Sequence, residues 1–206
     1  MKEGNALFEA IDTGFKVPSQ NVSVYFAADG EDVDFLTNDG DWTAYERKQV
    51  FSALETYSDV VNLTFSLAET ADQANFKLAK NASPQGSLGF MNVPDPDLGE
   101  FAGIAWFNTH FYWSGKAGGL LDQGSYTYTI FLHEFGHGLG LAHPHDTAFG
   151  STLMPDIGPG LGLDQGVYTV MTYNDGWPEA PNGSSDSRAW GWNLTPSPID
   201  IALLQE

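Results

Sequence analysis

The sequence predicts a single α/β domain over residues 1–206, with a regular upper part up to residue 143 and an irregular lower part over residues 144–206. Two observations indicate this fold class. In the upper part, short segments rich in β-formers alternate with two longer segments of helical period, which is typical of a sheet packed against helices. In the lower part, glycine, proline, asparagine and aspartate are abundant and periodicity is lost, as in loops. A chain of 206 residues is long enough to enclose one hydrophobic core.

Composition and charge exclude several classes of protein. The chain is 42% apolar and 14% aromatic, with 23 glycines and 11 prolines, which excludes a disordered tail, a coiled coil and a collagen-like fibre. Eight basic against 27 acidic residues give a net charge of −19, which repels phosphate backbones and anionic lipids. We therefore expect no nucleic-acid partner and no membrane partner. The absence of cysteine excludes disulfides, thiolate catalysis and cysteine zinc sites.

No segment has the features of a membrane span or an export signal. The apolar runs are all shorter than the roughly 18 residues that a span requires. Residues 1–11 contain one lysine and no hydrophobic stretch, so we expect no secretory signal peptide there.

The first elements follow from local patterns. Residues 22–27 alternate between apolar and polar side chains and predict a strand. Residues 29–41 hold six acidic residues among turn-formers and are expected to form a solvated loop, whose spacing fits no calcium-loop template. Residues 42–60 carry apolar side chains at helical period, with Thr43 and Glu46 placed as a capping box, and predict a long amphipathic helix.

Four further strands and two further helices are expected. The strands are at residues 63–67, 75–79, 88–93 and 104–108. The prolines and glycines around the third of them favour the edge of the sheet. A glycine-rich loop over residues 115–124 precedes a helix at 126–139 with Ser125 as its N-cap, and a short helix is expected at 199–204.

Three of the five histidines fall within eleven residues, in the string HEFGHGLGLAH. His133 and His137 are four apart, so on a helix their imidazoles can be directed at one point. Glu134 is beside that point but angled away from it, which suits a base acting on a metal-bound water better than a ligand. Gly140 allows the chain to leave the helix through a positive φ and to bring His143 back as a third ligand.

Three neutral nitrogen ligands predict a catalytic zinc site, because they leave a tetrahedral ion one open position for water. A lone histidine is more often a hydrogen-bonded structural residue than a ligand, but three at these spacings reverse that expectation. The remaining histidines, His110 and His145, are not expected to be ligands, since three imidazoles and a water fill the coordination shell.

The string HExxHxxGxxH resembles the motif of the metzincin clan of zinc endopeptidases. Residues 170–173 (Val-Met-Thr-Tyr) match the methionine turn that is the clan's second mark. Pro144 after the third histidine and Tyr173 two residues after Met171 are most similar to the serralysin family of bacterial secreted proteases. The resemblance implies a zincin-like fold with a twisted, mostly parallel sheet, an antiparallel edge strand, two long helices and a loop-rich C-terminal part that carries the methionine turn.

The same resemblance implies roles for two residues. Met171 would form an apolar floor beneath the imidazoles. Tyr173 would be a fifth zinc ligand in the resting site that swings away to hydrogen-bond the tetrahedral intermediate. The resemblance also implies a secreted, extracellular protein and calcium binding. Serralysins continue into glycine-aspartate repeats that bind calcium, and such repeats do not occur in this sequence, so calcium is implied by kinship only.

The predicted edge strand has a functional interpretation as well. If it borders the cleft, its unpaired amides and carbonyls can bind an extended peptide as an added antiparallel strand. The candidate substrate-binding residues are Gly86, Ser87, Leu88, Gly89 and Phe90. The alternative is an edge strand that a loop protects.

The sequence therefore predicts a zinc-dependent endopeptidase, a hydrolase that cleaves extended polypeptides with a metal-activated water and Glu134 as general base. We expect protein or peptide substrates and a monomeric protein. Two alternatives stay open: a protease domain that processes only its own parent polypeptide, and a non-catalytic zinc-bearing binding module. A dead module is expected to lack the base or a ligand, and all four residues are present.

Overall fold

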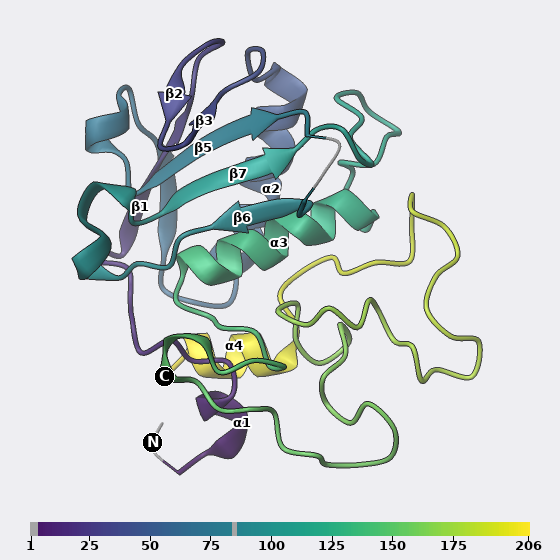
Figure 1. Cartoon of the computed structure of the whole chain (residues 1–206). Coiled ribbons are helices and arrows are strands. Elements are labelled where there is room, and N and C mark those ends of the chain that lie inside the picture. Colours follow the sequence, from purple (N-terminus) through teal and green to yellow (C-terminus); the bar gives the residue numbers. More distant parts are fainter. Residues whose placement is uncertain (1–3, 84–85) are drawn as a thin grey trace.

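The computed structural model describes residues 4–83 and 86–206. A five-stranded sheet occupies the upper half of the molecule, and two short helices and long loops occupy the lower half (Figure 1). Residues 1–3 lie outside the described residues. They are the start of the segment 1–11, in which we expect no signal peptide. In the part of the chain that is described, no helix is both long and apolar enough to cross a membrane.

The sheet is mostly parallel, as predicted, with strand order β4-β1-β5-β7-β6. Its strands are β1 (Asn21–Phe26), β4 (Thr64–Leu67), β5 (Phe76–Asn81), β6 (Gly89–Met91) and β7 (Ile104–Asn108). The β1–β4, β1–β5 and β5–β7 pairs are parallel. Only β6 runs antiparallel, with Phe90 opposite Trp106 of β7, so the predicted antiparallel edge strand is confirmed.

Two long helices pack against one face of the sheet. Helix α2 (Ala44–Ser58) begins at Thr43, and Thr43 and Glu46 exchange the hydrogen bonds of the predicted capping box. Helix α3 (Tyr126–Gly138) begins at Ser125, whose side chain accepts from the amide of Tyr128. The two helices and the sheet share one core, whose largest fully buried members include Tyr57, Phe76, Phe107, Phe131 and Phe135.

The acidic segment 29–41 is not the plain loop that the sequence predicted. It contains a hairpin of two short strands, β2 (Asp32–Val33) and β3 (Leu36–Thr37), which lies against β5. The cause is Asn38, whose buried amide group donates to the carbonyls of Ala27, Ala28 and Gly40 and accepts from the amide of Lys80. One satisfied polar side chain thus organises a segment whose charges alone indicate a solvated loop.

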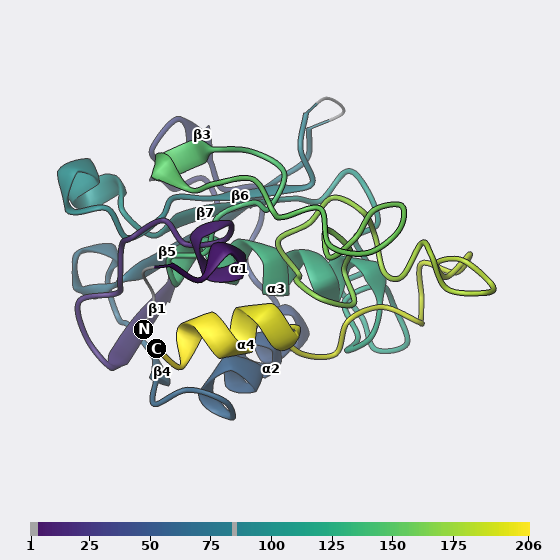
Figure 2. The same ribbon diagram turned by 90° about the horizontal axis from the view of Figure 1, so that it is seen from below.

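The lower half is built from both ends of the chain. Helix α1 (Ala6–Glu9), which the sequence did not predict, lies beside α4 (Pro198–Leu204), as the view from below shows (Figure 2). The described residues also contain three 3-10 turns, Ala71–Gln73, Pro96–Phe101 and Ala148–Gly150. The division at residue 143 stays a prediction, but α1 lies with the lower half.

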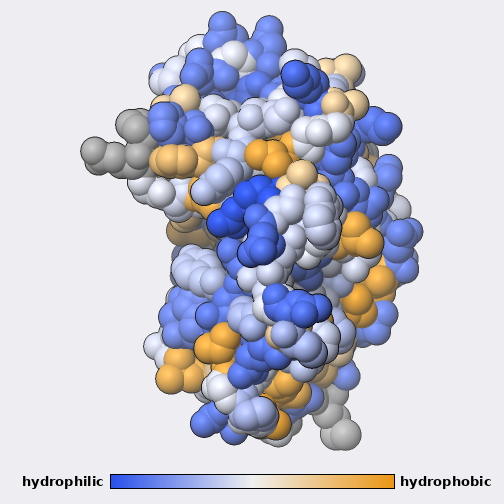
Figure 3. Space-filling view, turned by 90° about the vertical axis from the view of Figure 1, so that its right-hand side faces the viewer, coloured by the Kyte–Doolittle hydropathy of each residue, from blue (hydrophilic) through white to orange (hydrophobic). Residues whose placement is uncertain are grey.

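Hydrophilic residues cover most of the face seen in Figure 3, and apolar residues form separate patches among them. This agrees with the large negative charge of the sequence.

Candidate metal centre

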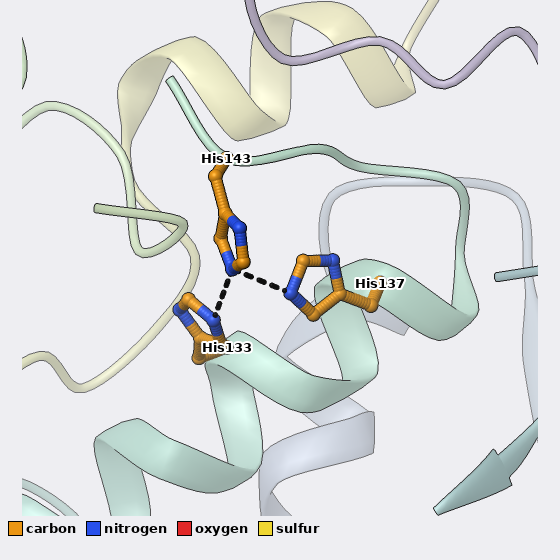
Figure 4. Close-up of side chains that lie close together, drawn as sticks. All are labelled: His133, His137 and His143. Carbon is orange, nitrogen blue, oxygen red and sulfur yellow. Dashed lines mark hydrogen bonds between the residues drawn. The ribbon is translucent and has the colours of Figure 1, made fainter. Parts of the chain in front are cut away.

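Helix α3 and the loop that follows it bring the three predicted histidine ligands together. His133 and His137 lie one turn apart on α3, and His143 reaches them from the returning loop (Figure 4). Nε2 of His143 lies 3.2 Å from Nε2 of His133 and 3.0 Å from Nε2 of His137. The first two rings are buried and the third is partly buried.

The opposite nitrogen of each ring has a fixed partner. Nδ1 of His133 donates to the carbonyl of Val170 at 2.7 Å, and Nδ1 of His137 donates to the carbonyl of Leu141 at 2.9 Å. Nδ1 of His143 lies 2.9 Å from the carboxylate of Asp146. Because carbonyls and carboxylates only accept, Nδ1 carries the proton in each neutral ring, and the three Nε2 lone pairs face one another.

This donor set fits zinc. Zinc–nitrogen bonds of about 2.0–2.1 Å in a tetrahedron separate the ligand nitrogens by about 3.3 Å. The two measured separations, 3.2 and 3.0 Å, are close to that value. Burial lowers the pKa of His133 to about 4 and that of His137 well below its ordinary value, with neighbouring imidazoles lowering both further. The rings are therefore neutral at neutral pH, as ligands must be.

Gly140 makes the turn that the sequence assigned to it. Its φ is 101°, in the left-handed region that favours glycine. A Cβ atom there would also clash with the carbonyl oxygen of Phe15. The carbonyl of Gly140 accepts from both the amide and the hydroxyl of Thr13, at 3.1 and 2.7 Å. The N-terminal segment thus fixes the loop that carries His143.

Met171 is fully buried directly beneath α3. Its sulfur is so close to Gly136 that a Cβ atom at that position would clash with it. Gly136 lies between the two helical histidines, so the methionine packs under the ligand-bearing turn of the helix. The role of Met171 as an apolar floor beneath the imidazoles stays a prediction.

Glu134 is buried on the side of α3 that lies against the edge strand β6. A Cβ atom on Gly89 would be 2.6 Å from its Oε1, so the glycine provides the room for this carboxylate. Among the described residues, none forms a hydrogen bond with the carboxylate. Burial raises the pKa of Glu134 to about 8. A cation at the histidine cluster would lower this pKa again, because an opposite charge favours the ionised form.

Tyr173 lies over the histidine cluster. Its ring centroid is 4.8 Å from that of His143 and 5.7 Å from that of His133. The residue is 67% exposed, so it borders open space and not the core. Although most of the residue is exposed, partial burial raises the pKa of Tyr173 above its ordinary value, and the negative charges of Glu134 and Asp146 raise it further.

The residues of the candidate substrate strand alternate between those whose backbone groups pair with β7 and those whose backbone groups face the open edge. The carbonyl of Leu88 accepts from Asn108, and the amide of Asn92 donates to Ile104, so both residues face β7. In an antiparallel pair this orientation alternates. The backbone groups of Gly89 and Met91 are therefore directed away from β7, toward the open edge. Phe90 faces β7 through its backbone, while Gly86 and Ser87 precede β6 as exposed residues.

Sequence reasoning missed two kinds of residue at this centre. Asp146 and the carbonyl of Val170 orient ligand rings, but neither forms part of a recognisable spacing. His145, set aside as a ligand, stacks on His143 with ring centroids 4.9 Å apart. His143, His145 and Asp146 are also close enough to form a metal-binding group, but this group shares His143, whose Nδ1 is already bonded to Asp146.

Comparison with known proteins identifies the family. Residues 3–144 match the metallo-peptidase family M12B, reprolysin-like. The chain belongs to this metallopeptidase family. The matched segment of the metallopeptidase includes α3 and all three histidines of the cluster.

The metallopeptidase chain is also similar to curated bacterial proteins. It is 29% identical over 169 residues to Metallopeptidase AprA of Pseudomonas marginalis, covering 80% of this chain and 34% of that protein. It is 26% identical over 185 residues to Serralysin of Proteus mirabilis, with coverages of 82% and 35%. It is 28% identical over 175 residues to Serralysin G of Dickeya chrysanthemi, with coverages of 80% and 33%. The chain thus spans about a third of the length of these relatives, and the predicted resemblance to serralysins is confirmed.

Proposed function

We propose that this protein is a zinc-dependent endopeptidase that hydrolyses extended polypeptides. The single observation that carries the proposal is the convergence of three Nε2 atoms, with each Nδ1 fixed by an acceptor. His133, His137 and His143 would hold the ion. Family membership supports the same chemistry.

A bound zinc ion supplies Lewis acidity and lowers the pKa of a water molecule to about 7. Glu134 acts as general base: its carboxylate takes the proton of that water as the oxygen attacks the scissile carbonyl. The same carboxylate then returns the proton to the leaving amine. The absence of a protein hydrogen bond to Glu134 among the described residues leaves the carboxylate available for this exchange.

Tyr173 has two proposed roles. Its phenol oxygen would be a further ligand of a bound ion, and its hydroxyl would donate to the scissile oxygen as negative charge develops there. The position of the ring over His143 and His133 supports both roles. Gly140 and Met171 act as the structural supports of the centre.

The open edge of β6 is proposed to bind the substrate backbone as an added antiparallel strand. Of the candidate residues Gly86, Ser87, Leu88, Gly89 and Phe90, Gly89 is best placed, because its backbone is directed to the edge and it adjoins Glu134. Secretion and calcium binding, which the resemblance implies, stay proposals. So do the monomeric state and the single-domain organisation.

The test is cleavage of unstructured casein by the purified protein, with and without a chelator, next to Glu134→Gln. We expect cleavage that the chelator abolishes and zinc restores, and about one zinc per chain in both proteins. Glu134→Gln keeps the ligands but loses the proton transfer, so its turnover should fall by at least about 10²–10⁴-fold. Full activity in zinc-free, folded protein would contradict the proposal.

The same experiment separates the two alternatives. A domain that processes only its own parent polypeptide would bind zinc and leave casein intact, but would cleave a peptide from its parent chain. A non-catalytic module would bind zinc and cleave neither.

A further inference from the structure

His145 is the one histidine outside the ligand set that touches the candidate metal centre. Its ring stacks nearly parallel on His143, with an angle of 14° between the planes and 4.9 Å between the centroids. It also contacts Tyr173, with ring centroids 4.4 Å apart. The three rings form a closed triangle, since His143 and Tyr173 are themselves 4.8 Å apart.

The backbone on both sides of Tyr173 is held firmly by Asp164. The carboxylate of Asp164 accepts from the hydroxyl of Thr172 at 2.5 Å, and its carbonyl accepts from the side chain of Asn174 at 2.7 Å. The hydroxyl of Thr172 in turn accepts from the amide of Asn174 at 2.9 Å. Tyr173 is thus the middle residue of a turn whose flanking residues, Thr172 and Asn174, are fixed by hydrogen bonds.

The ring of Tyr173 is not held in the same way. The residue is 67% exposed, and every aromatic ring in contact with it in the described structure is a tilted imidazole. Two of those imidazoles belong to the proposed ligands His133 and His143. Only His145 contacts the phenol ring without a proposed role in metal binding, and its contact is the shortest of the three.

We propose that His145 is a positioning residue whose ring face holds the phenol of Tyr173 over the metal centre. The inference rests on the proposed function, because it concerns a residue that acts there on the ion and the scissile oxygen. His145 acts through its ring: its Nδ1 is 4.0 Å from the carboxylate of Asp164, which is an ion-pair contact only when the imidazole is protonated and is beyond hydrogen-bond distance. A flat, apolar ring of similar size should therefore replace it.

The kinetic test compares His145→Ala and His145→Phe with the parent holoenzyme, each with Tyr and with Phe at position 173. We expect His145→Ala to lower kcat by about three- to tenfold, the range of an aromatic pair contact, and to leave KM and zinc content unchanged. His145→Phe should restore most of the loss. In the Tyr173→Phe background, His145→Ala should cause no further loss, because the hydroxyl that it positions is already absent.

A spectroscopic readout tests the position of the phenol without turnover. Copper(II) replaces zinc in the purified protein, and a phenolate ligand then gives a charge-transfer band in the visible range. Tyr173→Phe should abolish this band. His145→Ala should weaken or shift it, and His145→Phe should retain it.

The outcomes distinguish the inference from the proposed function. If Tyr173→Phe lowers kcat and His145→Ala changes neither kcat nor the band, the inference is wrong while the proposed function stands. If the losses in the double variant multiply independently, His145 acts on something other than Tyr173 and the inference is also wrong. If Tyr173→Phe changes nothing, the proposed role of Tyr173 fails, and this inference fails with it. More than one zinc per chain, lost in His145→Ala, would make His145 a ligand of a second ion and would overturn its role as a ring support.

Discussion

The carbonyl oxygen of Val170 lies 2.7 Å from Nδ1 of His133, so a residue of the methionine turn orients a ring on the active-site helix. The two residues are 37 positions apart, His133 on α3 and Val170 in the loop region before α4. A hydrogen bond to the second nitrogen fixes both the tautomer and the direction of a ligand imidazole. The methionine turn therefore takes part in the metal centre by orienting a proposed ligand that α3 supplies.

The turn at Val170 is held by Asp200 of α4. The fully buried carboxylate of Asp200 accepts from the amides of Val170 and Ser197, each at 2.8 Å, and from the hydroxyl of Thr169 at 2.5 Å. Burial nevertheless raises the pKa of Asp200 to about 6, against an ordinary value of 3.8. The chain of contacts runs from α4 through the methionine turn to His133.

We predict a pH-dependent contribution of Asp200 to the stability of the metal-free protein. Its folded-state pKa is above the unfolded value, so the folded state binds this proton more readily. The stability that results is fully present below about pH 4 and is lost as the pH rises through about 6, a total of roughly 3 kcal/mol. Urea unfolding of the parent and of Asp200→Asn from pH 4 to pH 7 measures it.

The free energy of unfolding of Asp200→Asn is subtracted from that of the parent at each pH, because His133 and the other groups titrate in both proteins. The stability of the parent relative to Asp200→Asn should be greatest at pH 4 and should shrink toward pH 7. A difference that is the same at every pH would show that Asp200 titrates alike in both states.

Much of the fold and the site could be predicted because the deciding interactions are local. The spacing of His133 and His137 is fixed by helix geometry, and the turn at Gly140 by its missing Cβ. The capping box of Thr43 and Glu46 is equally local, and it sets the start of α2.

The features that were missed depend on contacts distant in sequence. The hairpin within residues 29–41 depends on Asn38 reaching Lys80, 42 residues away. The orienting carbonyl of Val170 has no side-chain signature at all. The alternation along β6 could be predicted from the sequence, but which residues face the open edge depends on pairing with β7. Such information exists only once the sheet has formed.

Asp146 is predicted to strengthen metal binding by orienting His143. Asp146→Asn keeps one acceptor for the amide of Ala148, which the carboxylate now bonds at 2.9 Å, but replaces the acceptor that faces Nδ1 of His143. Loss of such a partner typically weakens metal affinity by about 10–100-fold. Competition with a chelator of known affinity measures the change. Asp156→Asn, which removes the same charge from an exposed position, is the control, and an equal effect of both would reduce the role of Asp146 to charge alone.

Gly89→Ala is predicted to disable the proposed base without disturbing the metal. The φ of Gly89 is not in the left-handed region, so alanine suits the backbone, but its Cβ atom would be 2.6 Å from Oε1 of Glu134. The carboxylate must move by a fraction of an ångström or more, and a misplacement of about 1 Å can cost about 10²-fold in rate. We expect kcat to fall by about 10–10²-fold with zinc content unchanged. An unchanged kcat in Gly89→Ala would remove Glu134 from the proposed position.

The open edge of β6 predicts how a bound peptide is recognised. The backbone groups of Gly89 and Met91 are directed to that edge, whereas those of Leu88 and Phe90 face β7. An added antiparallel strand would then use every second backbone amide. N-methylation along a peptide, one amide at a time, should weaken binding at alternate positions by about two- to tenfold, the net value of one hydrogen bond. The intervening amides should tolerate the methyl group better.

Binding is best measured on the zinc-loaded Glu134→Gln variant, so that cleavage does not consume the peptide. The parent peptide and each methylated form are titrated under the same conditions, and circular dichroism of the free peptides checks that methylation has not ordered them. A loss with period two is the pattern expected of a peptide added as a strand to β6. An equal loss at every position, or no loss at any position, would mean that the substrate backbone is bound elsewhere. The edge strand would then only pack against Glu134 and position its carboxylate.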